Sequence, residues 1–315
     1  MRKSKFGITI FLTAAFLCGA GSITAMADET EVAKGWQQED GRWIYQNADG
    51  TKATDTWIRE PYGKFYYLDS DGYMAVNQFI EDGSNLYYAD ETGNRARCRW
   101  ASASNAKREW DEDVDTIWYY FDKNGKAVKE EGKELNLNEN GTTRKYFFDS
   151  DGHMLSGWQE ITNSSNETNI YYLGDENQGY AHLLWQYLAP DEDMFQTDEH
   201  DNYDVYEMFY FGYDGKMTRS SESKLEGERF LFDANGVRIT GWQPGIVPTS
   251  SDQGINKYYD EKTGARAKGW LYAYDPEEGE GGEPHWYYCD KKTGLIYNEG
   301  GKDSGEAGGL TYKRI

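Results

Sequence analysis

Aromatic and small polar positions alternate in short blocks along this chain. In each block, an aromatic or apolar triplet is followed by an acidic stretch that closes on a glycine and then by a small or apolar residue. Aromatic residues favour β-strands, whereas Asp, Asn, Lys and Gly favour tight turns. Each block therefore predicts a short β-hairpin, made of the triplet, the turn and a brief return strand such as 73–75 or 153–155.

The block recurs about ten times with variable spacing. Neighbouring turn glycines lie between 21 residues apart, from Gly72 to Gly93, and 36 residues apart, from Gly179 to Gly215. They are Gly50, Gly72, Gly93, Gly125, Gly152, Gly179, Gly215, Gly236, Gly264 and Gly294. A hairpin this short cannot bury its apolar face alone, so neighbouring copies must supply the core. We therefore predict an all-β solenoid of about ten β-hairpins over residues 28–298, followed by a C-terminal tail over 299–315.

The composition favours a core of rings over a core of aliphatic side chains. Aromatic residues make up 16% of the chain, with 26 tyrosines and 11 tryptophans. Such rings can be half-buried against a neighbouring unit while one face stays open to a ligand. The formal charge of −22 argues against nucleic acid and anionic lipid as partners, because phosphate contacts need clustered Lys and Arg. The acidic residues also keep an aromatic-rich chain in solution.

The N-terminus predicts export. A basic start precedes an apolar run over residues 6–20, and Ala25-Met26-Ala27 has the form of a cleavage site. This is the pattern of a signal peptide over residues 1–27. The apolar run is too short for a stable membrane anchor, so we predict no membrane insertion after cleavage.

The remaining features predict loops rather than metal sites or disulfides. Cys98 and Cys289 lie far apart in the array and are expected to be isolated thiols. The acidic segment from Pro190 to Asp204 predicts a solvated loop. The DSDG turns at 69–72 and 149–152 lack the other ligands of a calcium loop and predict hairpin turns. Polar insertions are expected before the hairpins, as surface loops, at 101–115, 160–169, 186–207, 243–256 and 271–284.

Three short motifs recur at corresponding places in the units. They are the pairs Gly35-Trp36, Gly157-Trp158, Gly241-Trp242 and Gly269-Trp270, the triplets 65–67, 118–120 and 286–288, and the Gly-x-Met pieces at 72–74, 152–154 and 215–217. In these motifs the chain resembles the choline-binding, or cell-wall-binding, repeats of Gram-positive surface proteins, over nearly all of residues 34–298. Those repeats are close to the glucan-binding repeats of secreted glucosyltransferases and clostridial toxins. The resemblance implies a superhelix of hairpins with ligand sites between consecutive hairpins.

The resemblance also implies where choline would bind. In choline-binding members, a cage forms from the Trp of the Gly-Trp pair, the aromatic residue that opens the triplet, and a Tyr of the next unit. A quaternary ammonium donates no hydrogen bond, so ring faces must hold it. Carried over to this chain, one cage comprises Trp36, Trp43 and either Tyr66 or Tyr67. A second cage comprises Trp100, Trp118 and Tyr146.

Most other units depart from this pattern. Glycine is lost before Trp57, Trp100 and Trp185, and the tenth unit has Trp270 and Trp286 but no later unit to close a cage. The triplet opens instead on Phe65, Leu86, Lys145, Ile170, Met208 or Phe209, Arg229 and Lys257. Either a few sites bind choline or the array binds another ligand.

No catalytic signature accompanies the repeats. The four histidines are scattered without metal-ligand spacing, and no nucleophile elbow or phosphate-binding loop is found. We therefore predict a secreted, non-catalytic protein without cofactor or metal. It would attach to the choline of cell-wall teichoic acid, or to another envelope glycopolymer, and remain associated with the wall outside the cell. The alternatives are a carbohydrate-binding adhesin or effector that recognises glucans or host glycans, and a structural spacer without a ligand.

Overall fold

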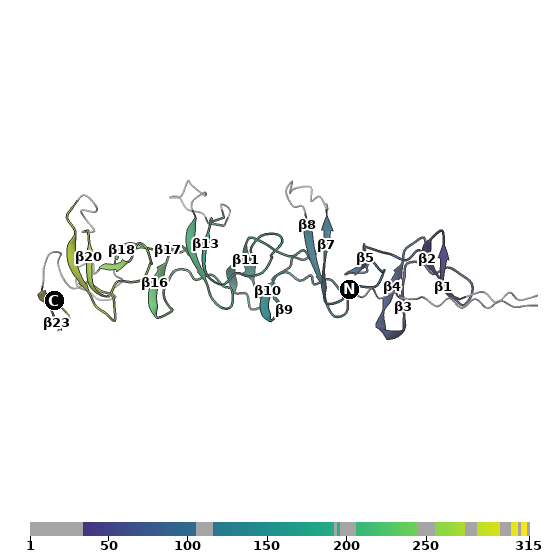
Figure 1. Ribbon diagram of the computed structural model, residues 1–315, viewed down its shortest axis with the longest axis horizontal. Coiled ribbons are helices and arrows are strands. Elements are labelled where there is room, and N and C mark those ends of the chain that lie inside the picture. The colour runs from purple at the N-terminus through teal and green to yellow at the C-terminus, as the bar shows by residue number, and fades with distance from the viewer. Residues whose placement is uncertain are drawn as a thin grey trace, which may run out of the picture. The chain divides into compact units, whose positions relative to one another are not determined.

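The regular structure consists of antiparallel β-hairpins that follow one another along the chain (Figure 1). The computed structural model describes residues 34–104, 116–191, 194–195, 206–244, 256–274, 282–296, 304–307 and 310–313. The predicted signal peptide and much of the acidic segment 190–204 lie outside these residues. The chain divides into two compact units, Met1–Ala75 and Val76–Ile315, which are described separately. No helix in the described ranges is long and apolar enough to cross a membrane.

Each hairpin pairs two strands that are consecutive in the sequence. In the first unit, β1 (Gly35–Glu39) pairs with β2 (Arg42–Gln46), and β3 (Thr56–Arg59) pairs with β4 (Phe65–Leu68) across the 3-10 turn Pro61–Gly63. In the second unit, the first five pairs are β5 (Gln78–Asp82) with β6 (Asn85–Ala89), β7 (Arg99–Ser104) with β8 (Thr116–Phe121), β9 (Leu135–Glu139) with β10 (Thr142–Tyr146), β11 (Trp158–Thr162) with β12 (Thr168–Tyr172), and β13 (Leu184–Leu188) with β14 (Glu207–Phe211). β15 (Ser221–Leu225) pairs with β16 (Glu228–Phe232), and β16 also pairs with β17 (Arg238–Ile239). The last three pairs are β18 (Gly241–Pro244) with β19 (Asn256–Tyr259), β20 (Gly269–Ala273) with β21 (His285–Cys289), and β22 (Ser304–Ala307) with β23 (Leu310–Lys313). The prediction of an all-β chain of repeated hairpins is confirmed.

The partner of each aromatic triplet differs from the prediction. The triplet pairs with the segment before it, which carries the Gly-Trp motif, so that Trp36 lies across from Tyr45 and Trp158 from Tyr172. The predicted return strands 73–75 and 153–155 are shorter than expected, because each pairs with its triplet strand through a single bridge, such as Met154 opposite Phe148. The backbone N–H of Leu155 also donates to the Phe147 carbonyl, at 2.9 Å. The backbone N–H of Met154 instead donates to the carbonyl of Trp118, at 2.8 Å, in the preceding hairpin. The residue two places after the turn glycine therefore bridges its own triplet strand and also joins its unit to the preceding one.

The long insertions also lie elsewhere than predicted. They fall within the hairpins rather than before them, because 101–115 joins β7 to β8 and 243–256 joins β18 to β19. At one end of each hairpin, the triplet strand packs on its turn and on the neighbouring unit. The loop that joins the two strands lies at the other end, and insertions there leave these contacts unchanged. The tail contains one more hairpin, β22 with β23, which the sequence did not indicate because it lacks an aromatic triplet.

The core forms where rings of consecutive hairpins meet, as the composition predicted. Trp158 packs on Tyr172 of its own hairpin with ring centroids 5.3 Å apart, and on Phe209 of the next hairpin at 4.9 Å. Trp185 repeats this arrangement on Tyr210, at 5.0 Å, and on Phe230, at 4.8 Å. Every such tryptophan thus buries its ring against two hairpins, and stability depends on neighbours.

The turn glycines are required by close approach as well as by backbone conformation. Gly215 has φ +79°, and a Cβ there would lie 2.9 Å from the Cβ of Ala181 in the preceding hairpin. Gly179 has φ +59°, and its Cβ would lie 2.2 Å from the sulfur of Met154. L-residues rarely adopt this conformation. Glycine therefore recurs once in each unit because its turn packs closely against the preceding unit.

The two cysteines in the described residues are free thiols. Cys98 is exposed and Cys289 is buried. Burial raises the pKa of the Cys289 thiol to about 12, so it stays protonated at neutral pH. This thiol is part of the packed interior rather than a reactive group.

Candidate functional site

The second predicted cage lines an open pocket built from consecutive hairpins. Trp100 on β7, Trp118 on β8 and Tyr146 on β10 face a cavity of about 440 Å³. The wall is completed by Glu139, Arg144, Met154, Asn177, Gln178 and Tyr180. The structure therefore brings together all three residues of this predicted cage.

Strand alternation and the contact between units position these rings. On β8, Ile117 and Tyr119 are buried while Trp118 between them is half-buried, because successive side chains point to opposite faces. Trp100 lies with its ring centroid 4.9 Å from that of Tyr146, and it stacks on Phe148 at 5.9 Å. One face of the pocket is therefore aromatic.

The other side of the pocket is polar. Tyr146 donates its hydroxyl hydrogen to Glu139 Oε1 at 2.9 Å, and Arg144 Nη1 pairs with Glu139 Oε2 at 2.9 Å. The Arg144 guanidinium also lies 4.2 Å from the centroid of the Tyr180 ring. Burial, and then the hydrogen bond to the Glu139 carboxylate, raise the pKa of Tyr146 to about 12. Tyr146 is therefore a neutral phenol at physiological pH. Glu139 and Arg144 lie outside the repeated motifs, so the sequence pattern does not indicate them.

The residues of the first predicted cage all lie in the unit Met1–Ala75. The ring of Trp36 lies 5.4 Å from that of Tyr66, and its indole N–H donates to Glu60 Oε1 at 2.6 Å. Tyr67 packs on Trp57 instead, at 5.1 Å. Trp43 is half-buried on β2, and its carbonyl accepts a hydrogen bond from Met74 at 2.8 Å. Of the two predicted tyrosines, Tyr66 is the one that meets Trp36.

Strand register defines four positions that recur in each pair of consecutive hairpins. We call them the cage positions. They are the Trp of the first strand, the residue opening the triplet, the second triplet residue of the next hairpin, and the residue two places after that hairpin's turn glycine. In the pocket they hold Trp100, Trp118, Tyr146 and Met154. In the two hairpins of Met1–Ala75 they hold Trp36, Trp43, Tyr66 and Met74.

The cage positions of β15–β16 and the following hairpin carry charges instead of rings. They hold Glu222, Arg229, Lys257 and Arg266. The strand register places Asn256 at the opening of this triplet and Lys257 second. The prediction that Lys257 opens the triplet is therefore wrong.

Glu222 is the centre of this ionic group. Its Oε1 accepts hydrogen bonds from the Tyr259 hydroxyl at 2.8 Å and from Arg266 Nη1 at 3.0 Å, and it pairs with Lys257 Nζ at 3.2 Å. Burial opposes ionisation of Glu222, yet the hydrogen bonds from Tyr259 and Arg266 outweigh it and lower the pKa. Glu222 is therefore a carboxylate at neutral pH, and this pair of hairpins has no aromatic cage.

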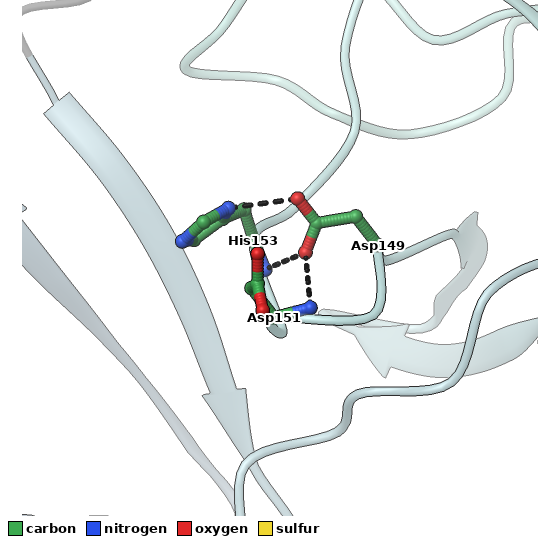
Figure 2. A group of neighbouring side chains, drawn as sticks. All are labelled: Asp149, Asp151 and His153. Atoms are coloured by element: carbon green, nitrogen blue, oxygen red, sulfur yellow. Dashed lines mark hydrogen bonds and ion pairs between the residues drawn. The ribbon is translucent and has the colours of Figure 1, made fainter. Parts of the chain in front are cut away.

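One turn in the described residues gathers potential metal ligands (Figure 2). Ligand atoms of Asp149, Asp151 and His153 lie within 4.8 Å of one another. Asp149 Oδ2 lies 2.7 Å from His153 Nδ1, and Oδ1 accepts the backbone N–H groups of Asp151 and His153 at 2.9 and 2.8 Å. Asp69 accepts the equivalent backbone bonds in its own turn, where Tyr73 replaces the histidine. The turn itself accounts for this geometry, as the sequence predicted for both DSDG segments.

This turn predicts a pH dependence of stability. Burial opposes ionisation of Asp149, but hydrogen bonds from His153 outweigh it and hold the pKa at about 2, below the ordinary 3.8. A depressed pKa contributes stability above the unfolded value, and this contribution is lost as pH falls towards 2. We expect Asp149→Asn to cost about 1–2 kcal/mol of unfolding free energy at pH 6 and little near pH 2. Urea denaturation across this range tests it, with Asp151→Asn as the control. A cost independent of pH would contradict the assignment.

Comparison with known proteins gives matches to repeat families and to larger enzymes. The choline-binding repeat matches residues 51–94, and a cell wall binding repeat matches 34–52 and 113–127. Glucosyltransferase-S of Streptococcus mutans is 26% identical over 266 residues, covering 71% of this chain and 17% of that protein. Glucosyltransferase-I of Streptococcus downei is 25% identical over 282 residues, covering 80% of this chain and 16% of that protein. The chain thus spans about a sixth of the length of these relatives.

A solved structure supports the fold. The modular autolysin LytC from Streptococcus pneumoniae matches with a TM-score of 0.52 at 19% identity, over 89% of this chain and 51% of that chain. At this identity the likeness concerns the arrangement of hairpins and not the ligand.

Proposed function

The chain is built from repeats of the choline-binding, or cell-wall-binding, family of Gram-positive surface proteins, and we propose that it attaches to choline-bearing glycopolymers of such a wall. Repeats of this family imply a location at the cell surface or outside the cell. The signal peptide expected over residues 1–27 would deliver the chain there.

The pocket lined by Trp100, Trp118 and Tyr146 carries this proposal. Two indoles and a phenol converge on one cavity of about 440 Å³, ample for a trimethylammonium group. Ring faces attract such a cation by about 0.5–2 kcal/mol each, depending on desolvation. The formal charge of −22 adds a negative field around the chain, whereas the Glu139 carboxylate in the pocket is paired with Arg144.

We propose binding without catalysis. What the chain shares with the glucosyltransferases amounts to 16–17% of their length, and the family matches within it are binding repeats. Their activity is therefore not carried over to this chain.

Trp118→Ala is expected to weaken choline binding at this pocket about tenfold, since it removes one ring face from the cation. Leu86→Ala is the matched control, because Leu86 opens the triplet of the preceding hairpin. Both variants can be bound to isolated choline-containing cell walls and eluted with a choline gradient. We expect Trp118→Ala to elute at a lower choline concentration than the wild type, and Leu86→Ala to elute together with the wild type. Retention that choline does not affect would refute it.

A second candidate, glucan binding, is favoured by the polar side of the same pocket. Arg144, Asn177 and Gln178 also line it, and sugars bind by stacking on an aromatic face while hydroxyls form hydrogen bonds. The similarity to glucosyltransferases points in the same direction. Binding to immobilised dextran that choline does not displace would favour this candidate over the first.

A further inference from the structure

Basic side chains gather in one place on this acidic protein. Lys224, Arg229, Arg266, Lys268, Lys291 and Lys292 line a second cavity, of about 240 Å³, together with Gly227 and Glu228. We call this cavity the basic pocket. Six of its eight lining residues are basic and one is acidic, although the whole chain has 55 acidic and 33 basic residues.

The basic pocket occupies the place of an aromatic cage. Arg229 stands where Trp118 stands in the aromatic pocket, and Arg266 stands where Met154 stands. The backbone confirms this equivalence, because the N–H of Arg266 donates to the carbonyl of Arg229 at 2.7 Å, just as Met154 donates to Trp118 at 2.8 Å. Two of the four cage positions, those of Arg229 and Arg266, thus line the basic pocket, and both carry cations where the aromatic pocket has Trp118 and Met154.

Acidic residues compensate part of this positive charge. Glu222 pairs with Arg266, Lys257 and Arg229, and Glu228 pairs with Lys268 at 2.5 Å. Arg266 also donates to the Lys292 carbonyl at 2.8 Å, which fixes its guanidinium beside the turn. A third carboxylate, that of Asp290, also attracts Arg266, so seven cations share three carboxylates.

Three lysines carry the excess charge. Lys224, Lys291 and Lys292 are exposed, and in the described part of the chain no ion pair engages their ammonium groups. Like charges held together repel one another unless an anion lies between them. Flexible lysine stems with compact charges suit a phosphate, whose oxygens accept from several donors at once.

We propose that the basic pocket binds a phosphodiester group of an anionic glycopolymer. The anion site follows from the geometry alone, whereas the identification of its source as a wall polymer rests on the proposed function. The aromatic and basic pockets would then hold the two charged groups of one polymer, a quaternary ammonium and a phosphodiester. The formal charge of −22 conceals such a site because it averages over the chain.

The test uses the double variant Lys291→Gln/Lys292→Gln in the whole protein. Both substitutions keep the backbone groups that bond Asp290 and Arg266. The control, Lys123→Gln/Lys126→Gln, removes two exposed lysines from the equivalent turn of an earlier hairpin. Probes are an oligomer of glycerol phosphate, inorganic phosphate and a neutral dextran oligomer, titrated at low and moderate salt, with circular dichroism to verify folding.

The expected result is binding of the glycerol phosphate oligomer that weakens with salt, about tenfold weaker in the pocket variant and unchanged in the control. Dextran should not compete, and Trp118→Ala should leave this binding intact, which separates the inference from choline recognition. Equal binding by both lysine variants, or no binding of the oligomer by the wild type, would overturn the proposal. Binding of inorganic phosphate alone would reduce the pocket to a simple anion site and overturn the polymer assignment.

Discussion

Replacing Trp158 by alanine is expected to lower the free energy of unfolding by about 3–5 kcal/mol. The indole packs on Tyr172, Phe195 and Phe209, all within ring-centroid distances of 4.9–5.3 Å. Its N–H also donates to the Ala189 carbonyl at 2.9 Å. The substitution leaves a cavity between two hairpins and an unpaired acceptor, and the surroundings can collapse only in part.

Urea denaturation followed by circular dichroism measures this effect. Tyr213→Ala provides the control, because that ring is 83% exposed and its loss should change stability by no more than about 0.5 kcal/mol. Similar losses for the two variants would mean that stacking between hairpins does not hold the array together.

Removing the Glu222 carboxylate is expected to have the second large effect. Glu222→Ala leaves Arg266, whose side chain is 7% exposed, as an unpaired charge beside Lys257. Breaking a buried ion pair in this way costs about 3 kcal/mol. The Tyr259 hydroxyl also loses its acceptor.

The control for this charge effect is Glu228→Ala. Glu228 pairs with Lys268, and both side chains are substantially exposed, at 41% and 52%. Exposed pairs contribute at most about 1 kcal/mol. Thermal unfolding should therefore show a large drop for Glu222→Ala and a small one for Glu228→Ala. A reversed order would show that the ionic group does not stabilise this pair of hairpins.

The repeated unit could be predicted from the sequence, whereas the pairing within it could not. An aromatic triplet followed by a turn fits a hairpin with the segment on either side. In the structure the preceding segment forms the longer partner strand and the following segment only a single bridge. Hydrogen bonds between units, such as the one from Met154 to Trp118, also hold the following segment, and these leave no local pattern. The glycine period was visible because it records close contacts between units, as at Gly215.

The candidate site was predictable where rings repeat in register. Trp100, Trp118 and Tyr146 occupy three of the cage positions of two consecutive hairpins, and the structure brings them to one pocket. Glu139 and Arg144 escaped prediction because they lie on strands outside the motif. The basic pocket escaped because net charge gives no information about clustering, and because Glu222 stands where the motif expects a tryptophan.

Calorimetric titration of the protein with choline is the most direct test of whether the pocket of Trp100, Trp118 and Tyr146 binds choline. We expect saturable heat at millimolar choline, with about tenfold weaker binding at one site in Trp118→Ala and unchanged binding in Leu86→Ala. A parallel titration with glucan oligosaccharides separates the second candidate. A flat choline isotherm for the wild type would contradict the claim that Trp100, Trp118 and Tyr146 form a choline site.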